Sequence, residues 1–576
     1  MKLRFVLPAL APLAFLAACA TTAPAQSAGL KPSQDVAFEA DEPVSPYGLF
    51  LAGQAAMHND RAEDASRYFT RAGQAGLDGA FFRERAFIAA AMSGDIPLAA
   101  KLSPDSPDTR LVIQRLAALI EVVADIGEGD GQRATELLAN GAVNVPHRPA
   151  AALLTPWVAA TAGDEVGALT RPDLRGDRLV EIFGQLGQAQ LFERAKRYDE
   201  AETDYMALVG LDGSGVLFAA DYGGFLERRR RWADAAAVYD KALLKTPRDP
   251  ELLAARERVT RRRGAPPLPT IRQGAARGLV APAAQMMTDH QYEMATAYLR
   301  MVLYLDPTRD DARVMMGDAM AAEKDIEGAR AAYSAIPAGS AQYAGARSKL
   351  AWTYQTSKDS ETALRIARGV YEAGGKDDQA AITYADLLRA NDLYAESAAV
   401  MDGVITRAGP TPDWRLLYMR GVALERSGRW PDAERDLRAA LAARPNEPEL
   451  LNYLGYSWID RGERLGEAMD MVKRAVAANP DSGAAVDSLG WAYYRMGDYR
   501  NAVEQLEAAV LLDPADPDIN DHLGDAYWRV GRVIEARFQW QRVLTLEPTD
   551  RVRQEVEAKI KSGLDPVGPP AVTASN

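Results

Sequence analysis

The sequence predicts an all-α fold, a solenoid in which antiparallel helix pairs stack into a superhelix. Prolines recur 34 or 35 residues apart near the end of the chain, at Pro445, Pro480, Pro514 and Pro548. Between them, apolar residues follow one another at steps of three and four, which gives each of two helices one apolar stripe. Because neither helix can bury its stripe alone, neighbouring units must stack into a continuous core. This self-similarity predicts about ten to twelve units in two arrays.

The chain begins with the pattern of a secretory signal. Two basic residues, Lys2 and Arg4, precede an apolar run that ends in Leu16-Ala17-Ala18-Cys19, and Cys19 is the only cysteine of the chain. The run is too short to span a bilayer permanently, and a single cysteine cannot close an intramolecular disulfide. These residues resemble the signal of a bacterial lipoprotein, which implies cleavage before Cys19 and attachment of lipid to it. An ordinary secretory signal with a chance cysteine is the alternative.

A flexible tether is expected after the cysteine. From Thr21 to about Pro46 the chain is rich in Ala, Thr, Pro and Ser and has little apolar periodicity. Each buried lipid methylene stabilises membrane attachment by about 0.8 kcal/mol, so two or three chains would hold the protein permanently. Ala20 follows the cysteine, and in Gram-negative lipoproteins this implies the outer membrane. The mature chain is therefore expected in the cell envelope, as an outer-membrane lipoprotein that faces the periplasm.

Composition shifts divide the sequence into six predicted parts. These are a signal peptide at 1–18, a tether at 19–45, an N-terminal array at 46–262, a junction at 263–282, a C-terminal array at 283–562 and a disordered tail at 563–576. In the N-terminal array the repeat phase is hard to follow between about Asp105 and Gly176. The junction holds Pro266, Pro267 and Pro269 together with glycines, which interrupt helical periodicity.

The last units share residues at fixed offsets. One unit has Leu489-Gly490, Tyr493, Gly497, Ala502, Leu506 and Ala509, and the next has Leu523-Gly524, Tyr527, Gly531, Ala536, Trp540 and Val543. Small residues are expected where paired helices approach closely, a turn is expected at Gly497 with Asp498, and Pro514 is expected to end the second helix. At these residues the chain resembles a tetratricopeptide repeat (TPR) array, which implies a TPR solenoid over nearly all of the mature chain.

This resemblance also implies which residues face a ligand, because in TPR arrays the first helix of each unit lines the concave face. The corresponding positions of the C-terminal repeats hold Tyr418, Asn452, Tyr456, Asp487, Trp491, Tyr494, Asp521, Asp525 and Trp528. Tyr and Trp bury large areas at low entropic cost, so an aromatic strip is typical of a protein-binding surface. Packing between repeats is the alternative role for each of these aromatic residues. TPR proteins that clamp a C-terminal carboxylate use Lys, Arg and Asn here, so such a ligand is not expected.

Three blocks of sequence extend the resemblance to TPR outer-membrane lipoproteins of alphaproteobacterial type. They are residues 451–458, 486–491 and 520–528. The resemblance includes the pseudomonad lipoprotein adaptor of a periplasmic C-terminal-processing protease, which trims enzymes that cut peptidoglycan cross-links. It implies a non-catalytic, membrane-anchored scaffold. Its implied partners are envelope proteins, among them such a protease and its client.

The sequence lacks the patterns typical of catalysis or of metal and cofactor binding. His58, His147, His290 and His522 are not at metal-ligand spacing, and each is expected on the surface or in a turn. The run from Gly127 to Gly131 lacks the Lys-Ser/Thr of a phosphate loop and is expected to be an inter-helix turn. A net charge of −13 argues against nucleic acid as a ligand. We therefore expect a non-enzyme without a cofactor.

Two other functions stay open on the sequence alone. An assembly or secretion factor for pilus or exported polysaccharide components would also be a non-catalytic repeat protein. A cell-wall enzyme is the remote alternative, and turnover of cell-wall substrate by the purified chain would support it.

Overall fold

The computed structural model describes residues 45–564, except for 60, 76–78, 107, 173, 175, 248 and 375–377. The predicted signal peptide, Cys19, the predicted tether up to residue 44, and residues 565–576 lie outside the described residues. All regular elements of the described part are helices, which confirms the predicted all-α fold. No helix in this part combines the length and the apolar character that a bilayer span requires.

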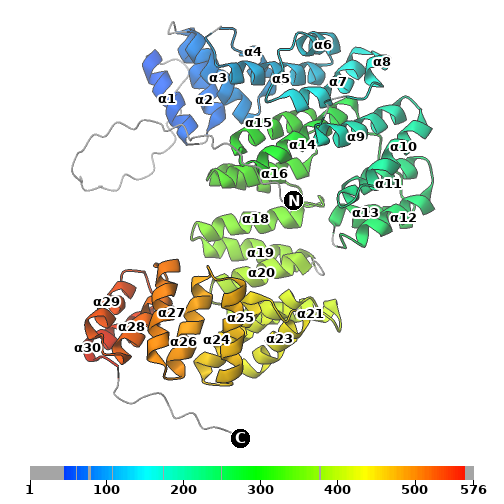
Figure 1. Cartoon of the computed structure of the whole chain (residues 1–576). Coiled ribbons are helices and arrows are strands. Elements are labelled where there is room, and N and C mark those ends of the chain that lie inside the picture. Colours follow the sequence, from blue (N-terminus) through cyan, green and yellow to red (C-terminus); the bar gives the residue numbers. More distant parts are fainter. Residues whose placement is uncertain are drawn as a thin grey trace, which may run out of the picture.

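The N-terminal half of the chain contains thirteen α-helices and one 3-10 helix among its described residues (Figure 1). They are α1 Pro46–His58, α2 Ala62–Gln74, α3 Gly79–Ser93, α4 Ile96–Lys101, α5 Leu111–Glu128, α6 Gly131–Ala139, α7 Arg148–Ala162, α8 Glu165–Ala168, α9 Arg178–Arg194, α10 Tyr198–Val209, η1 Gly215–Phe218, α11 Ala219–Arg228, α12 Trp232–Leu243 and α13 Pro250–Thr260. Helices of very unequal length follow one another from α5 to α8, with 18, 9, 15 and 4 residues. This inequality explains why the repeat phase is hard to follow there. The turn predicted at 127–131 is present but is confined to Gly129, which ends α5 in a left-handed conformation, and Asp130, which caps α6.

The C-terminal half continues the helical hairpins to the end of the described chain. Its helices are α14 Ile271–Thr288, α15 Tyr292–Leu305, α16 Asp310–Ala322, α17 Ile326–Ser334, α18 Tyr343–Thr356, α19 Ser360–Gly374, α20 Asp378–Ala390, α21 Tyr394–Ala408, α22 Trp414–Arg426, α23 Trp430–Ala443, α24 Pro448–Arg461, α25 Leu465–Ala478, α26 Gly483–Arg495, α27 Tyr499–Leu512, α28 Pro517–Arg529, α29 Val533–Val543 and α30 Asp550–Ser562. Consecutive helices pack against each other throughout, as the pairing of apolar stripes predicts.

Small residues allow the two helices of a hairpin to approach closely. A Cβ atom at Gly490 would lie 2.6 Å from the side chain of Leu506, and one at Gly524 would lie 2.5 Å from Trp540. Ala502 of α27 has no exposed surface. The positions expected to be small because helices meet there are therefore confirmed.

The turn between two paired helices uses a left-handed residue. Gly497 has a φ of 82°, and the carboxylate of Asp498 accepts a hydrogen bond from the backbone N–H of Asn501 at 3.3 Å, which confirms the predicted turn. Most upstream hairpins place a residue other than glycine at the same point. These left-handed residues are Lys196, Arg230, His290, Lys324, Lys358 and Asp392. Their turns accordingly carry no glycine signal, which weakens the repeat pattern upstream.

The second half of the predicted junction is helical. Residues 263–270 are not helical, but α14 contains Gly274, Gly278 and Pro282. A Cβ atom at Gly274 would lie 2.1 Å from the ring of Trp157 on α7. The glycine thus allows α7 and α14 to meet, and this packing outweighs a helix-propensity cost of about 1 kcal/mol per glycine. The interruption expected to extend to Pro282 ends before α14.

The middle helices also pack against the N-terminal helices (Figure 1). Helix α14 contacts α7 and α9, while α15 contacts α3, α4 and α5. One buried cluster contains Phe87, Leu119, Trp157, Tyr298 and Leu350, so a single core runs across the predicted junction. The chain therefore folds back on itself at α14 and α15, which brings residues far apart in sequence into contact.

Candidate functional site

Three neighbouring helices carry most of the predicted ligand-facing residues. Helix α26 contacts both α24 and α28, and Figure 1 shows the three together in the C-terminal part of the molecule. On each helix the predicted residues follow at steps of three or four, so they lie on one helix face.

Aromatic rings of α26 and α28 form a continuous stack. The ring of Trp491 lies between His522, at a centroid distance of 4.0 Å and an angle of 15°, and Tyr494, at 4.6 Å and 6°. Tyr499 contacts Tyr494 edge-on at 5.3 Å, and Arg529 Nε donates a hydrogen bond to the Tyr494 hydroxyl at 3.2 Å. The rings are therefore held in one orientation before any partner arrives, which lowers the entropic cost of binding.

A buried ion pair fixes the histidine end of this stack. His522 Nδ1 lies 2.9 Å and 3.1 Å from the two carboxylate oxygens of Asp487, and both side chains are buried. Burial opposes a charge on the imidazole, but Asp487, Asp521 and Asp525 outweigh it and raise the pKa of His522 to about 9. At neutral pH the stack therefore begins with a cation.

Helix α30, the last helix of the described residues, covers part of the predicted face. Lys559 Nζ of α30 donates to Asp521 at 2.7 Å and to Asp525 at 2.9 Å. Burial, followed by the charge of Asp521, raises the pKa of Asp525 to about 6, although Lys559 acts in the opposite direction. A Cβ atom at Gly563, just after α30, would lie 2.0 Å from the ring of Trp528. Asp521, Asp525 and Trp528 thus contact the C-terminal end of the fold itself.

The remaining predicted residues lie along α22 and α24. Tyr418 packs edge-on against Tyr453 at 5.7 Å, and the ring of Tyr456 lies 6.4 Å from that of His522. Asn452 Oδ1 and Trp491 Nε1 are shielded from solvent, and neither has a hydrogen-bond partner within the described part of the chain. We define the aromatic face as Asn452, Tyr456, Trp491, Tyr494 and His522.

The expectation that each histidine lies on the surface or in a turn is wrong for His522. It lies inside α28 and is buried against Trp491. His147 precedes α7 in a bend, but it is fully buried and its Nδ1 lies 2.8 Å from the Tyr298 hydroxyl. Burial lowers the pKa of His147 to about 4. The described residues contain no group of three or more His, Cys, Asp or Glu that could hold a metal ion.

The sequence contained a signal for the buried ion pair. Asp487 and His522 are one repeat length apart and lie on adjacent first helices, so their side chains could be expected to meet. By contrast, Lys559 lies beyond the last complete hairpin, where the repeat pattern makes no prediction.

Comparison with known proteins agrees with the helical hairpins. A tetratricopeptide repeat family model matches residues 186–251 and 418–483, and a second TPR repeat model matches residues 490–531. Three segments of the chain therefore match TPR repeats, and the described part has the all-helical TPR solenoid fold. The TPR segments 418–483 and 490–531 include the whole aromatic face.

The relatives found match a part of this chain or are similar to it at low sequence identity. A TPR repeat-containing protein of Pseudomonas aeruginosa is 33% identical over 147 residues, which are 25% of this chain and 24% of that protein. The chain thus spans about a quarter of the length of this curated relative. Among solved structures, the Cut9–Hcn1 hetero-tetramer of APC/C has a chain 15% identical, covering 90% of this chain and 96% of its own, with a TM-score of 0.39. A TPR protein from Parabacteroides merdae is 13% identical, covers 44% of this chain and 97% of its own, and has a TM-score of 0.38.

TPR arrays are scaffolds for protein–protein interaction, and they are typically non-catalytic. A rigid strip of aromatic rings on neighbouring helices is compatible with this role, since such rings act as binding anchors.

Proposed function

We propose that this protein is a scaffold that binds a partner protein through the aromatic face. The observation that supports this proposal is the preordered stack of Trp491 and Tyr494, two half-buried rings on one face of α26. Rings held in place in this way offer a large contact area to a partner at a low entropic cost.

We further propose that the scaffold is anchored in the cell envelope through lipid on Cys19. The sequence around Cys19 supports an outer-membrane lipoprotein that faces the periplasm. There it would act as an adaptor that recruits a C-terminal-processing protease and its client, an enzyme of peptidoglycan cleavage. The resemblance of residues 451–458, 486–491 and 520–528 to lipoprotein adaptors supports this role. Holding two proteins on one scaffold would raise their effective concentration for each other.

Replacing the only thiol tests the anchor. Cys19→Ser is expected to move the protein from the membrane fraction to the soluble periplasmic fraction, because each lost methylene removes about 0.8 kcal/mol of membrane affinity. Fractionation of cells, with detection of the protein in each fraction, measures this. Two results would contradict the proposed lipid anchor. One is wild-type protein that incorporates no labelled fatty acid, and the other is Cys19→Ser protein that stays in the membrane fraction.

Removing the two central rings tests the aromatic face. Trp491→Ala with Tyr494→Ala, in the Cys19→Ser background, is expected to lose the partner captured from an envelope extract, since each aromatic anchor contributes about 2 kcal/mol or more. Mass spectrometry of the captured proteins measures the loss, and a processing protease is the expected partner.

The matched control changes exposed apolar residues on the second helices. Leu511 and Ile534 are each 83% exposed on α27 and α29, and Leu511→Ala with Ile534→Ala is expected to capture the partner normally. Equal capture of the partner by the Cys19→Ser protein and by both double-alanine variants, with circular dichroism unchanged, would refute the aromatic face as the binding surface. Capture of secretin or polysaccharide-export components instead of a protease would support the assembly-factor alternative.

A further inference from the structure

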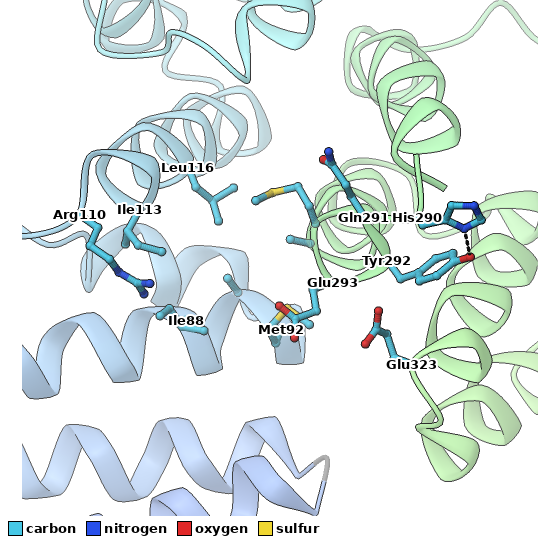
Figure 2. A pocket seen from close by; sticks show the side chains of 13 residues that line it. Ile88, Met92, Arg110, Ile113, Leu116, His290, Gln291, Tyr292, Glu293 and Glu323 are labelled. Carbon is cyan, nitrogen blue, oxygen red and sulfur yellow. Dashed lines mark hydrogen bonds between the residues drawn. The ribbon is translucent and has the colours of Figure 1, made fainter. Parts of the chain in front are cut away.

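A second surface with the features of a docking site lies in the other half of the molecule. Where α15 packs against the N-terminal helices, they enclose a cleft of about 490 Å³ (Figure 2). Ile88 and Met92 of α3 line it, together with Ile113 and Leu116 of α5, and Met294 at the start of α15 completes the apolar lining. The volume lies within the range of about 300–1,000 Å³ that is typical of ligand pockets.

An adjoining hollow of about 270 Å³ extends this cleft toward α2 and α16. Both share Met92, Glu293 and Glu323, and the hollow adds Met57 and Met320 to its lining. Methionine side chains are unbranched and polarizable, so they adapt to apolar side chains of different shape. The lining therefore suits an inserted peptide segment better than one rigid ligand.

The acidic residues that line the cleft have no ion-pair partner among the described residues, whereas one basic residue of the lining, Arg110, has one. Glu293 and Glu323 are exposed, and their carboxylates form no hydrogen bond or ion pair with any residue that the structure describes. Figure 2 shows Glu293 beside Met92 and Glu323 farther along, near Tyr292. Arg110, on the opposite wall, is paired with Glu84 at 3.3 Å. The mouth therefore presents two carboxylates that a cationic side chain could neutralise.

Two basic residues lie near these carboxylates, and neither forms an ion pair with them among the described residues. Arg300 lines the adjoining hollow, where burial lowers its pKa although the charge of Asp325 acts in the opposite direction. His290 Nδ1 lies 2.6 Å from the Tyr292 hydroxyl, and Figure 2 shows this contact.

We propose that this cleft docks a peptide segment of a partner protein that inserts apolar side chains and places a lysine or arginine against Glu293 and Glu323. The apolar lining supplies affinity, and the two carboxylates supply specificity for a basic residue beside the inserted side chains. The site is separate from the aromatic face. Its walls come from α3, α5 and α15, so an occupant would also bridge the N-terminal helices and the middle of the chain.

Charge reversal tests the proposal with a defined probe. The lysine probe is a short fluorescein-labelled amphipathic peptide of leucine and lysine. A second peptide, the glutamate probe, has every lysine replaced by glutamate. Fluorescence anisotropy with the full-length Cys19→Ser chain is expected to show binding of the lysine probe and a roughly tenfold loss of affinity in Glu293→Lys with Glu323→Lys. The glutamate probe is expected to bind the charge-reversed protein better than the wild type.

Matched variants separate this cleft from general surface charge. Glu504 and Glu557 are also exposed and form no ion pair with described residues, so Glu504→Lys with Glu557→Lys makes the same change of net charge elsewhere. This control is expected to change lysine-probe affinity by less than about twofold. An equal loss of affinity in both charge-reversed proteins would overturn the proposal.

A polar substitution in the wall tests the apolar part of the site. Ile113→Gln is expected to weaken the lysine probe roughly fivefold to tenfold, whereas Ile534→Gln, on the exposed face of α29, is expected to have no effect. Trp491→Ala is expected to leave probe affinity unchanged, which separates this site from the aromatic face. The proposal would be overturned in favour of a purely apolar site if an uncharged leucine peptide bound as tightly as the lysine probe and had the same affinity for the wild type and for Glu293→Lys with Glu323→Lys.

Discussion

Trp540→Ala is expected to lower the free energy of unfolding of the C-terminal repeats by about 3–5 kcal/mol. Trp540 has no exposed surface, and its indole lies against Gly524, which offers no side chain to refill the space. Its Nε1 also donates a hydrogen bond to the buried carboxylate of Asp525 at 3.0 Å. The substitution therefore creates a cavity and removes a donor from a buried acceptor, and both changes destabilise the fold. Urea unfolding followed by circular dichroism measures the loss.

An exposed aromatic residue on the same helix is the matched control. Phe538 is 63% exposed on α29, so Phe538→Ala is expected to change the free energy of unfolding by less than about 0.5 kcal/mol. Equal losses in the two variants would show that α29 is stabilised by helix propensity alone, not by the fit of Trp540 against α28.

The hairpins could be predicted from the sequence because each is a local unit. The offset from Gly490 to Leu506 is repeated from Gly524 to Trp540, and both pairs are in contact. Apolar periodicity and small residues within about 35 residues contain all the information that such a pair requires. Where hairpins use Lys324 or Asp392 in the turn, the glycine signal is absent although the backbone is the same.

The return of the chain at α14 could not be predicted in this way. Gly274, Gly278 and Pro282 are typical helix breakers, and only contact with α7 shows why glycine is tolerated there. Trp157, which fills the space above Gly274, is distant in sequence and lies outside the predicted C-terminal array. Tertiary packing of this kind leaves no periodic signal.

The candidate site could be predicted only where its residues occupy positions that recur from repeat to repeat. The resemblance supplied the positions of Trp491 and Tyr494, which the structure stacks on each other. It supplied no information about His522, a position that it does not count as ligand-facing. It also could not show that Lys559 pairs with Asp521, because α30 follows the last complete hairpin.

Asp487→Ala is expected to destabilise the C-terminal repeats by about 3–5 kcal/mol at pH 7, because it leaves the buried imidazolium of His522 without its counter-charge. The side chains of Asp487 and His522 are only 8% and 11% exposed, so water cannot replace the lost carboxylate. Asp481 is exposed just before α26 and forms no ion pair with described residues, so Asp481→Ala is expected to change stability by less than about 0.5 kcal/mol. Equal stability of the two variants would contradict a buried, charged pair.

The same ion pair predicts how stability depends on pH. The pKa of His522 is raised from 6.5 to about 9 in the folded protein, so its contribution is fully present below pH 6.5 and is lost as pH rises through 9. The wild-type free energy of unfolding is therefore expected to fall by about 3 kcal/mol over this window from this group. Asp487→Asn removes the charge that holds the proton, so the difference in stability between wild type and variant should shrink from pH 6.5 to pH 10.

Direct titration of the imidazole separates the ion pair from other ionisable groups. Proton NMR of selectively labelled histidine is expected to place the titration of wild-type His522 near pH 9. In Asp487→Asn the same imidazole is expected to titrate at a lower pH, because the carboxylate that favours its charged form is gone. Because His522 stacks on Trp491, loss of its charge also removes a cation from the end of the aromatic face. Partner capture through this face should therefore weaken above pH 9 in the wild type, and Asp487→Asn should show the weaker capture already at pH 7. A partner bound equally well by both proteins at both pH values would mean that the charge on His522 serves the fold alone.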